Sequence, residues 1–161
     1  MDSPVFFGIA RLEFVLSHPW RKNKDAPRMG HPTQFTRPPD NRNTMPLDWE
    51  QGVLAEGLRC YRSREFFAAH EHWECEWLRA AEPEKTFLQA LIQIAAAFHH
   101  FERKNRAGAA SLLRASLRKL DLYPAAFGGL DVEAIRQSVR AWLSALDAGE
   151  PAPELPFPTI R

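Results

Sequence analysis

The stretch Phe66-Phe67-Ala68-Ala69-His70-Glu71-His72-Trp73-Glu74-Cys75-Glu76-Trp77-Leu78 decides how the rest of the chain must fold. At about 100° per residue it predicts a helix with two unlike faces. His70 and Glu74 fall on the face that carries the aromatic side chains, whereas His72 and Glu76 fall among charged neighbours. An imidazole and a carboxylate on an apolar face are costly to bury unless they are paired or bound. The sequence therefore predicts a polar site against this helix.

Composition and charge limit the class of protein. The chain has 161 residues, of which 45% are hydrophobic and 25% charged, with a formal net charge of +1. This length suits one domain, and the small charge does not favour nucleic acid as a partner. No run of about 18 apolar residues is present, so we expect no membrane span. Cys60 and Cys75 lack disulfide-scaffold or metal spacing, which favours free thiols in a reducing cytoplasm.

Prolines divide the chain into three parts. Residues 1–44 combine scattered prolines with basic side chains and no periodicity, so we expect a flexible arm. For this arm, a basic tether that binds an acidic partner is the functional alternative. Residues 45–149 form the expected helical domain. Residues 150–161 form a proline-rich tail without regular structure.

Apolar periodicity in the middle part predicts an all-α fold, a single bundle of about five helices, because no strand pattern is found. The expected helices span residues 47–60, 64–81, 85–104, 106–120 and 132–148. The expected N-caps are Asp48, Ser63, Asn105 and Asp131. Gly57 costs about 1 kcal/mol relative to Ala inside a helix, which indicates a close approach by another element.

The third expected helix has no Asp, Glu, Lys or Arg through its middle, which is typical of burial on several sides. Gln89, Gln93 and His100 share one face of it. Buried amides and imidazoles need partners. A short loop makes this helix antiparallel to the preceding one, so we expect its polar face to meet His70 and Glu74.

His70 and Glu74, one turn apart, can hold zinc or another divalent transition metal from one helix face. His100 is the expected third ligand, ahead of His99. Glu71 is the candidate general base for metal-assisted hydrolysis, since a bound metal can activate water. The HExxH motif of metalloproteases is absent, because Glu74 stands in the place of its second histidine.

Gln89, Gln93 and Trp77 are expected to contact or orient whatever binds at this site, whether a metal or another small ligand. The alternative is a non-catalytic scaffold or protein-interaction module, in which the same polar side chains bond one another as a structural network. Tryptophans at helical spacing are also typical of core packing. The sequence leaves the reaction, the metal and self-association open.

Two segments in this order resemble the DUF309 family of small bacterial and archaeal helical proteins. The first carries the motif His70-xxx-Glu74-xx-Trp77, and the second is the run from Phe87 to Ala109. The resemblance covers roughly residues 47–124. It implies an all-α bundle of uncharacterised function, for which metal binding through the His/Glu motif has been suggested.

Two residues depart from the pattern of the family. Ala90 and Lys104 stand where glycine is usual. The resemblance implies that these changes affect helix packing or a turn rather than the His/Glu site.

Overall fold

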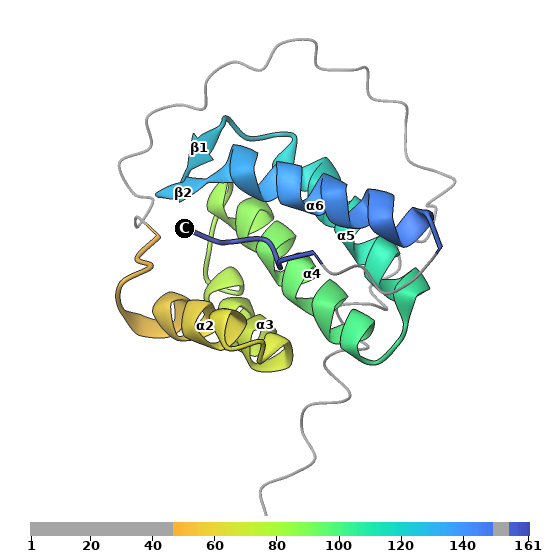
Figure 1. The fold of residues 1–161 in the computed structure, drawn as a ribbon. Helices are drawn as coiled ribbons and strands as arrows, with labels where there is room; N and C mark the ends of the chain where they lie inside the picture. The colour runs from red at the N-terminus through yellow and green to blue at the C-terminus, as the bar shows by residue number, and fades with distance from the viewer. Residues whose placement is uncertain (1–46, 150–154) are drawn as a thin grey trace, which may run out of the picture. The chain divides into compact units, whose positions relative to one another are not determined.

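The computed structural model describes residues 47–149 and 155–161, so the arm expected over residues 1–44 lies outside this part. This part of the chain forms five helices, arranged as Figure 1 shows, and the predicted all-α bundle is confirmed. The helices are α2 (Gly52–Arg62), α3 (Phe66–Trp77), α4 (Glu84–Glu102), α5 (Arg106–Leu120) and α6 (Val132–Asp147). None of the described helices is long and apolar enough to cross a membrane.

A short hairpin precedes α6 and was not expected from the sequence. Strands β1 (Ala126–Phe127) and β2 (Leu130–Asp131) pair antiparallel. Gly128 and Gly129 connect them with φ of 58° and 83°. These left-handed values favour glycine, which explains why two glycines form this turn.

Helix α4 packs against α3 on one side and against α5 on the other, while α2 covers α3 and α6 packs on α5. Most residues of α4 are buried, including Ala90 and the three consecutive alanines at 95–97. Small side chains allow neighbouring helices to approach closely, and burial on two sides explains why the middle of this helix carries no Asp, Glu, Lys or Arg.

Gly57 makes the contact between α2 and α3 possible. A Cβ atom built at Gly57 would lie 2.4 Å from Nε1 of Trp73, which is completely buried. The indole N–H of Trp73 donates to the Leu54 carbonyl at 3.3 Å. The close approach predicted at Gly57 is therefore made by a tryptophan side chain.

Two of the four expected N-caps are confirmed. The Asn105 side chain accepts a hydrogen bond from the amide of Gly108, and the Asp131 side chain accepts one from Ala134, both at 2.9 Å. These bonds satisfy amide groups that lack a partner within the helix.

The other two expected N-caps are wrong. Asp48 accepts bonds from the amides of Glu50 and Gln51 in a turn before α2, and the helix itself begins later. Ser63 is the residue at which α2 ends, and Glu65 immediately precedes α3. In both places a polar residue suited to a cap lies in a turn next to the helix rather than at its start.

Helix α4 ends at Glu102, and Lys104, two residues further on, is left-handed with φ of 61°. The Lys104 amide donates to the Phe101 carbonyl and the Asn105 amide donates to the His100 carbonyl, both at 2.9 Å. This Schellman pattern favours glycine at its left-handed position. Lys104 therefore occupies a position where the family resemblance also implies glycine, and its backbone is strained.

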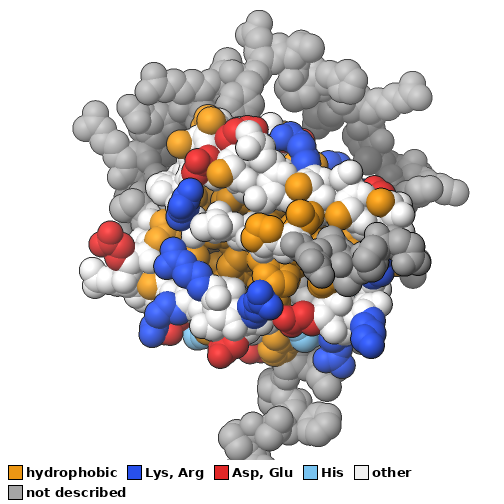
Figure 2. All heavy atoms as spheres, viewed as in Figure 1, with side chains coloured by type: hydrophobic (Ala, Val, Ile, Leu, Met, Phe, Trp, Pro, Cys, Tyr) orange, Lys and Arg blue, Asp and Glu red, His pale blue; other side chains and the backbone are white. Residues whose placement is uncertain are grey.

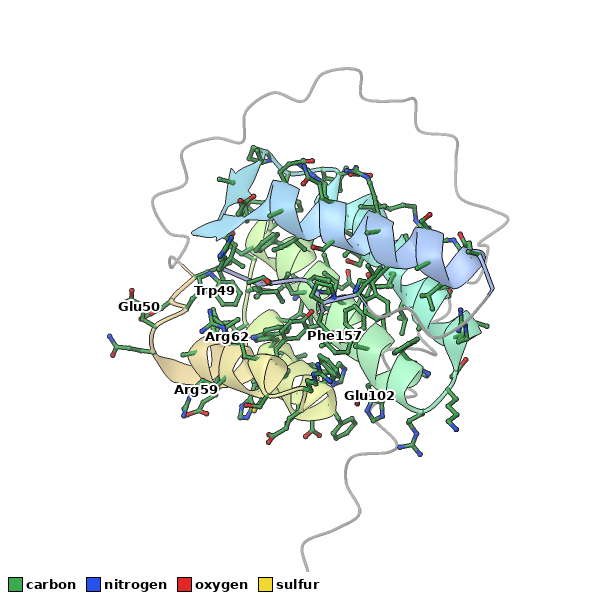
Figure 3. All side chains as sticks on the ribbon, viewed as in Figure 1. Trp49, Glu50, Arg59, Arg62, Glu102 and Phe157 are labelled. Atoms are coloured by element: carbon green, nitrogen blue, oxygen red, sulfur yellow. The ribbon has the colours of Figure 1, made fainter. Side chains whose placement is uncertain are left out.

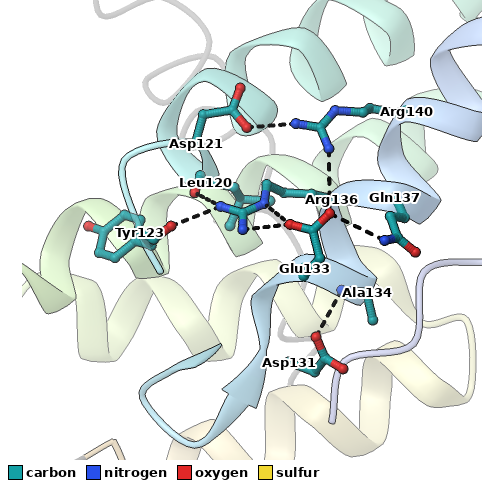
Figure 4. Close-up of polar contacts among 9 residues, drawn as sticks. All are labelled: Leu120, Asp121, Tyr123, Asp131, Glu133, Ala134, Arg136, Gln137 and Arg140. Atoms are coloured by element: carbon teal, nitrogen blue, oxygen red, sulfur yellow. Dashed lines mark hydrogen bonds and ion pairs between the residues drawn. The ribbon is translucent and has the colours of Figure 1, made fainter. Parts of the chain in front are cut away.

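The buried guanidinium of Arg136 joins α6 to the end of α5 (Figure 4). Its Nη1 donates to the carbonyls of Leu120 and Tyr123 at 2.9 Å, and its Nε donates to Glu133 at 2.9 Å. Carbonyl groups at a helix C-terminus lack partners within the helix and carry partial negative charge. Arg136 supplies both the missing hydrogen-bond donors and a positive charge with one side chain.

Residues 155–161 have no regular structure, as expected for a proline-rich tail, yet they pack on the domain. Ile160 is 1% exposed, and Pro158 is also buried. Figure 1 shows this segment crossing in front of α4, between α6 and the pair formed by α2 and α3. The tail therefore contributes core side chains that the sequence did not predict.

Lys104→Gly is expected to raise the free energy of unfolding by about 1 kcal/mol, because glycine adopts a left-handed φ without a Cβ penalty. Arg103, at φ −83°, is the adjacent control position, where glycine should bring no gain. Thermal unfolding of both variants measures the difference. A gain at Arg103 equal to that at Lys104 would contradict the assignment.

Arg136→Ala is expected to lower the free energy of unfolding by about 3 kcal/mol, because it leaves two carbonyls without their donor. Arg140→Ala is the matched control, since Arg140 is exposed and pairs with Asp121 at 2.9 Å. Its loss should stay under about 1 kcal/mol. Urea unfolding followed by circular dichroism compares them, and equal losses would refute the role of Arg136.

Candidate functional site

Helix α3 buries one of its two His/Glu pairs. His70 is 2% exposed and Glu74 is 7% exposed. His72 and Glu76, two residues further along in each case, are only half-buried. The helical period explains the difference, because a shift of two residues turns a side chain about 200° around the helix. The buried pair therefore lies on the side of α3 that packs on the rest of the domain.

Neither ring nitrogen of His70 has a hydrogen-bond partner among the described residues. The Phe67 ring stacks on the imidazole with centroids 6.1 Å apart and also contacts His99 of α4 at 5.4 Å. Buried polar side-chain atoms usually have at least one partner, so an orphaned imidazole calls for an explanation such as a bound water, an ion or a function.

Burial, with a smaller contribution from His99, lowers the pKa of His70 from 6.5 to about 4. Burial also lowers the pKa of His99 and of His100, with nearby Arg103 adding to both shifts. His70 is therefore neutral at neutral pH. In that form one ring nitrogen carries a free lone pair, which can accept a hydrogen bond or bind a metal.

The polar face of α4 that was expected to meet His70 makes its bonds toward α5. Gln93 Oε1 accepts a hydrogen bond from Lys119 Nζ at 3.1 Å. The Asn105 side-chain amide lies 2.9 Å from His100 Nδ1, at the start of α5. Gln93 and His100 are seven residues apart and so share a face. That face lies toward α5, because both residues bond to Lys119 of α5 or to Asn105 at its N-cap.

His99, rather than His100, is the histidine of α4 that lies beside the aromatic contact with His70. His99 precedes His100 by one residue and so lies about 100° away around the helix, which is enough to move a side chain from one interface to the next. The expected set of His70, Glu74 and His100 is not brought together as a metal cluster. Within residues 47–149 and 155–161, no group of three or more His, Cys, Asp or Glu side chains could hold a metal.

The remaining expected site residues are all less buried than His70. Glu71 is exposed, and Gln89 is half-buried. Trp77 is half-buried, and Lys85 Nζ lies 5.0 Å from its ring centroid. The His70 side chain makes no hydrogen bond to any of these three residues.

Sequence reasoning missed two sets of residues. Arg136 lies on the apolar face of α6, four residues after Val132 and three before Val139. A charge at that position indicates a buried, paired side chain, and this signal was present in the sequence. Phe157 and Ile160 are the two large apolar residues at the end of a proline-rich segment. In an extended proline-rich chain with three residues per turn, this spacing of three places both side chains on one side, so the pattern indicates an apolar side of the tail.

The fold and this interface define a small helical-bundle domain with an uncharged histidine buried between two of its helices. Residues 54–112 match the family described as a Domain of unknown function (DUF309). That range runs from α2 into α5 and includes both His70 and Glu74. The resemblance found in the sequence is thereby confirmed over these residues. No curated protein matches the chain.

Stability should fall as the pH is lowered from about 6.5 to about 4. The pKa of His70 in the folded state is below its ordinary value, so the unfolded chain binds more protons throughout this interval. The difference between the two pKa values corresponds to a loss of about 3 kcal/mol in the free energy of unfolding by pH 4. Urea unfolding at pH 7.5, 5.5 and 4.5 measures this dependence.

His70→Leu is expected to remove most of that pH dependence and to leave the protein at least as stable at pH 7.5, because it removes a buried group without partners. His72→Leu, on the half-buried pair of the same helix, is the control and should keep the dependence of the unsubstituted protein. A His70→Leu variant with unchanged pH dependence would show that other groups, such as His99, are responsible.

Proposed function

We propose that the domain is a binding module whose interface between α3 and α4 takes a divalent transition metal, or a ligand of similar size, at His70. The observation that supports this is the 2% exposed imidazole with no partner for either ring nitrogen among the described residues. A neutral imidazole is the form that binds Zn²⁺ and related ions. A ligand here would supply the partner that the imidazole lacks.

In this proposal His70 is the first ligand and Glu74, one turn along α3, is the second. The described residues do not assemble three protein ligands. An ion held by two would keep water or a bound small molecule in its other positions and bind more weakly than in a closed zinc site. Such open positions are what a small ligand would use.

Metal-assisted hydrolysis, with Glu71 as the base, remains the reaction expected from the sequence. Glu71 is exposed and lies about 100° around the helix from His70, so its position gives this step no support. The proposal is therefore limited to binding. We also propose a cytoplasmic location, which the free thiols of Cys60 and Cys75 support.

His70→Ala is expected to abolish binding of Zn²⁺ or Co²⁺ to protein purified without a histidine tag. His72→Ala is the matched control, because it removes a histidine from the other face of the same helix and should leave binding unchanged. Elemental analysis gives the metal content, and calorimetric titration gives the affinity. Glu74→Gln should weaken binding at least tenfold, since it removes the second ligand.

Equal metal content in the His70→Ala and His72→Ala variants would refute the metal proposal. A cobalt absorption band that persists in His70→Ala would do the same, since it would place the ion elsewhere.

The second candidate is a non-catalytic helical scaffold that acts through protein contacts. It is favoured by the bonds of Gln93 and His100 toward α5, because these polar side chains already serve the packing of two helices. Under this alternative the unsubstituted protein binds neither metal in the same titration. His70→Leu would then stabilise the protein without loss of any ligand.

A further inference from the structure

The C-terminal segment, residues 155–161, occupies an aromatic groove formed by three helices. The ring of Phe157 lies 4.9 Å from Phe66 of α3, 4.8 Å from Phe98 of α4 and 5.4 Å from Trp142 of α6. Figure 3 shows Phe157 in the space between α6 above and the pair of α2 and α3 below. We call Phe66, Phe98 and Trp142 the tail groove.

The polar contacts that hold the segment use its backbone carbonyls. The indole N–H of Trp142 donates to the carbonyl of Pro156 at 2.9 Å, and the Asp131 amide donates to the carbonyl of Arg161 at 2.8 Å. The Arg62 guanidinium makes a longer contact, 3.4 Å, with the carbonyl before Arg161. Every peptide has such carbonyls, so these donors can serve any extended segment whose side chains fit the tail groove.

The sequence of the segment suits an extended, proline-rich conformation. Pro156 and Pro158 flank Phe157, and a polyproline II chain has three residues per turn, so Phe157 and Ile160 fall on one side. Ile160 is 1% exposed. An aromatic groove with a tryptophan N–H that binds a backbone carbonyl is the chemistry by which proline-rich peptides are recognised.

Arg64 closes the groove from the turn between α2 and α3. Its guanidinium carbon lies 4.9 Å from the centroid of the Phe157 ring. Its φ is 63°, the left-handed value of the Schellman pattern that ends α2, in which the Arg64 amide donates to the Tyr61 carbonyl and the Glu65 amide donates to the Cys60 carbonyl. Figure 2 shows apolar side chains gathered across the middle of this face, with Lys and Arg side chains around them.

We propose that the tail groove is a docking surface for an extended segment of a partner protein with the pattern proline, aromatic, proline, any residue, aliphatic. Residues 155–161 are then a built-in competitor that covers the groove until it is displaced. A tethered segment acts at an effective concentration in the millimolar range, so a partner peptide binds the intact chain weakly. This inference is independent of the site at His70.

The test uses the full chain with Phe157→Ala and Ile160→Ala together, which frees the groove of its two apolar anchors. The probe is a fluorescent peptide of sequence Leu-Pro-Phe-Pro-Thr-Ile-Arg, and the control peptide has alanine in place of Phe and Ile. Fluorescence anisotropy should show that the double variant binds the probe at least tenfold more tightly than the unsubstituted chain. The control peptide should bind neither.

A double variant that stays folded by circular dichroism but does not bind the probe overturns the proposal. If the unsubstituted chain forms a dimer at high concentration that the double variant does not form, the groove belongs to the tail of a second copy, and the partner assignment is overturned as well.

If the double variant unfolds, hydrogen exchange on the unsubstituted chain decides the question. Amides of residues 157, 159, 160 and 161 that exchange at least tenfold faster than those of α4 show that the tail leaves the groove while the domain stays folded. Exchange at the same rate as α4 would make the tail a fixed part of the core and would overturn the proposal.

Discussion

The packing of α4 between two helices is the constraint on which the rest of the structure depends. A helix covered on opposite sides must bury both of those sides, and α4 buries ten of its 19 residues, all of them alanines or large apolar residues. Any polar group it carries must find a partner in one of two separate interfaces. Gln93 and Nδ1 of His100 find theirs at α5, while Nε2 of His100 is buried without a hydrogen-bond partner among the described residues. The interface with α3 is left with fewer polar groups, which makes the position of His70 costly.

His70 illustrates how a domain retains a group that lowers its stability. An apolar side chain in its place would need no partner, whereas the imidazole is desolvated, held neutral and without a hydrogen bond among the described residues. Natural sequences break local rules mainly where a function or a strained site requires it. Arg136 is the useful contrast, because it is also buried but its guanidinium donates to two carbonyls and a carboxylate. The difference between these two side chains separates a structural polar residue from a candidate site.

The C-terminal residues show that regular structure and structural importance are separate properties. Residues 155–161 form neither helix nor strand, but Phe157 contacts side chains from α3, α4 and α6. Prolines prevent a helix and at the same time keep the segment extended, so that two apolar side chains reach one groove. The same feature that argued for an unstructured tail therefore also favours docking.

The sequence by itself determined the helices and their buried faces. In the last helix the apolar residues recur at helical spacing, and all six are buried: Val132, Ile135, Val139, Trp142, Leu143 and Leu146. Burial of His70 and Glu74 also followed from the period alone, because 3.6 residues per turn assigns every side chain of an isolated helix to a face.

Only the tertiary structure decided which neighbour each face meets. A helix with two buried sides offers two equivalent interfaces, and periodicity does not tell them apart. Gln93 and His100 were expected at α3 and make their bonds toward α5, while His99, one residue away, lies on the α3 side. The docking of Phe157 and Ile160 could not be predicted from the sequence either, because it depends on a groove formed by three helices that are distant in the sequence.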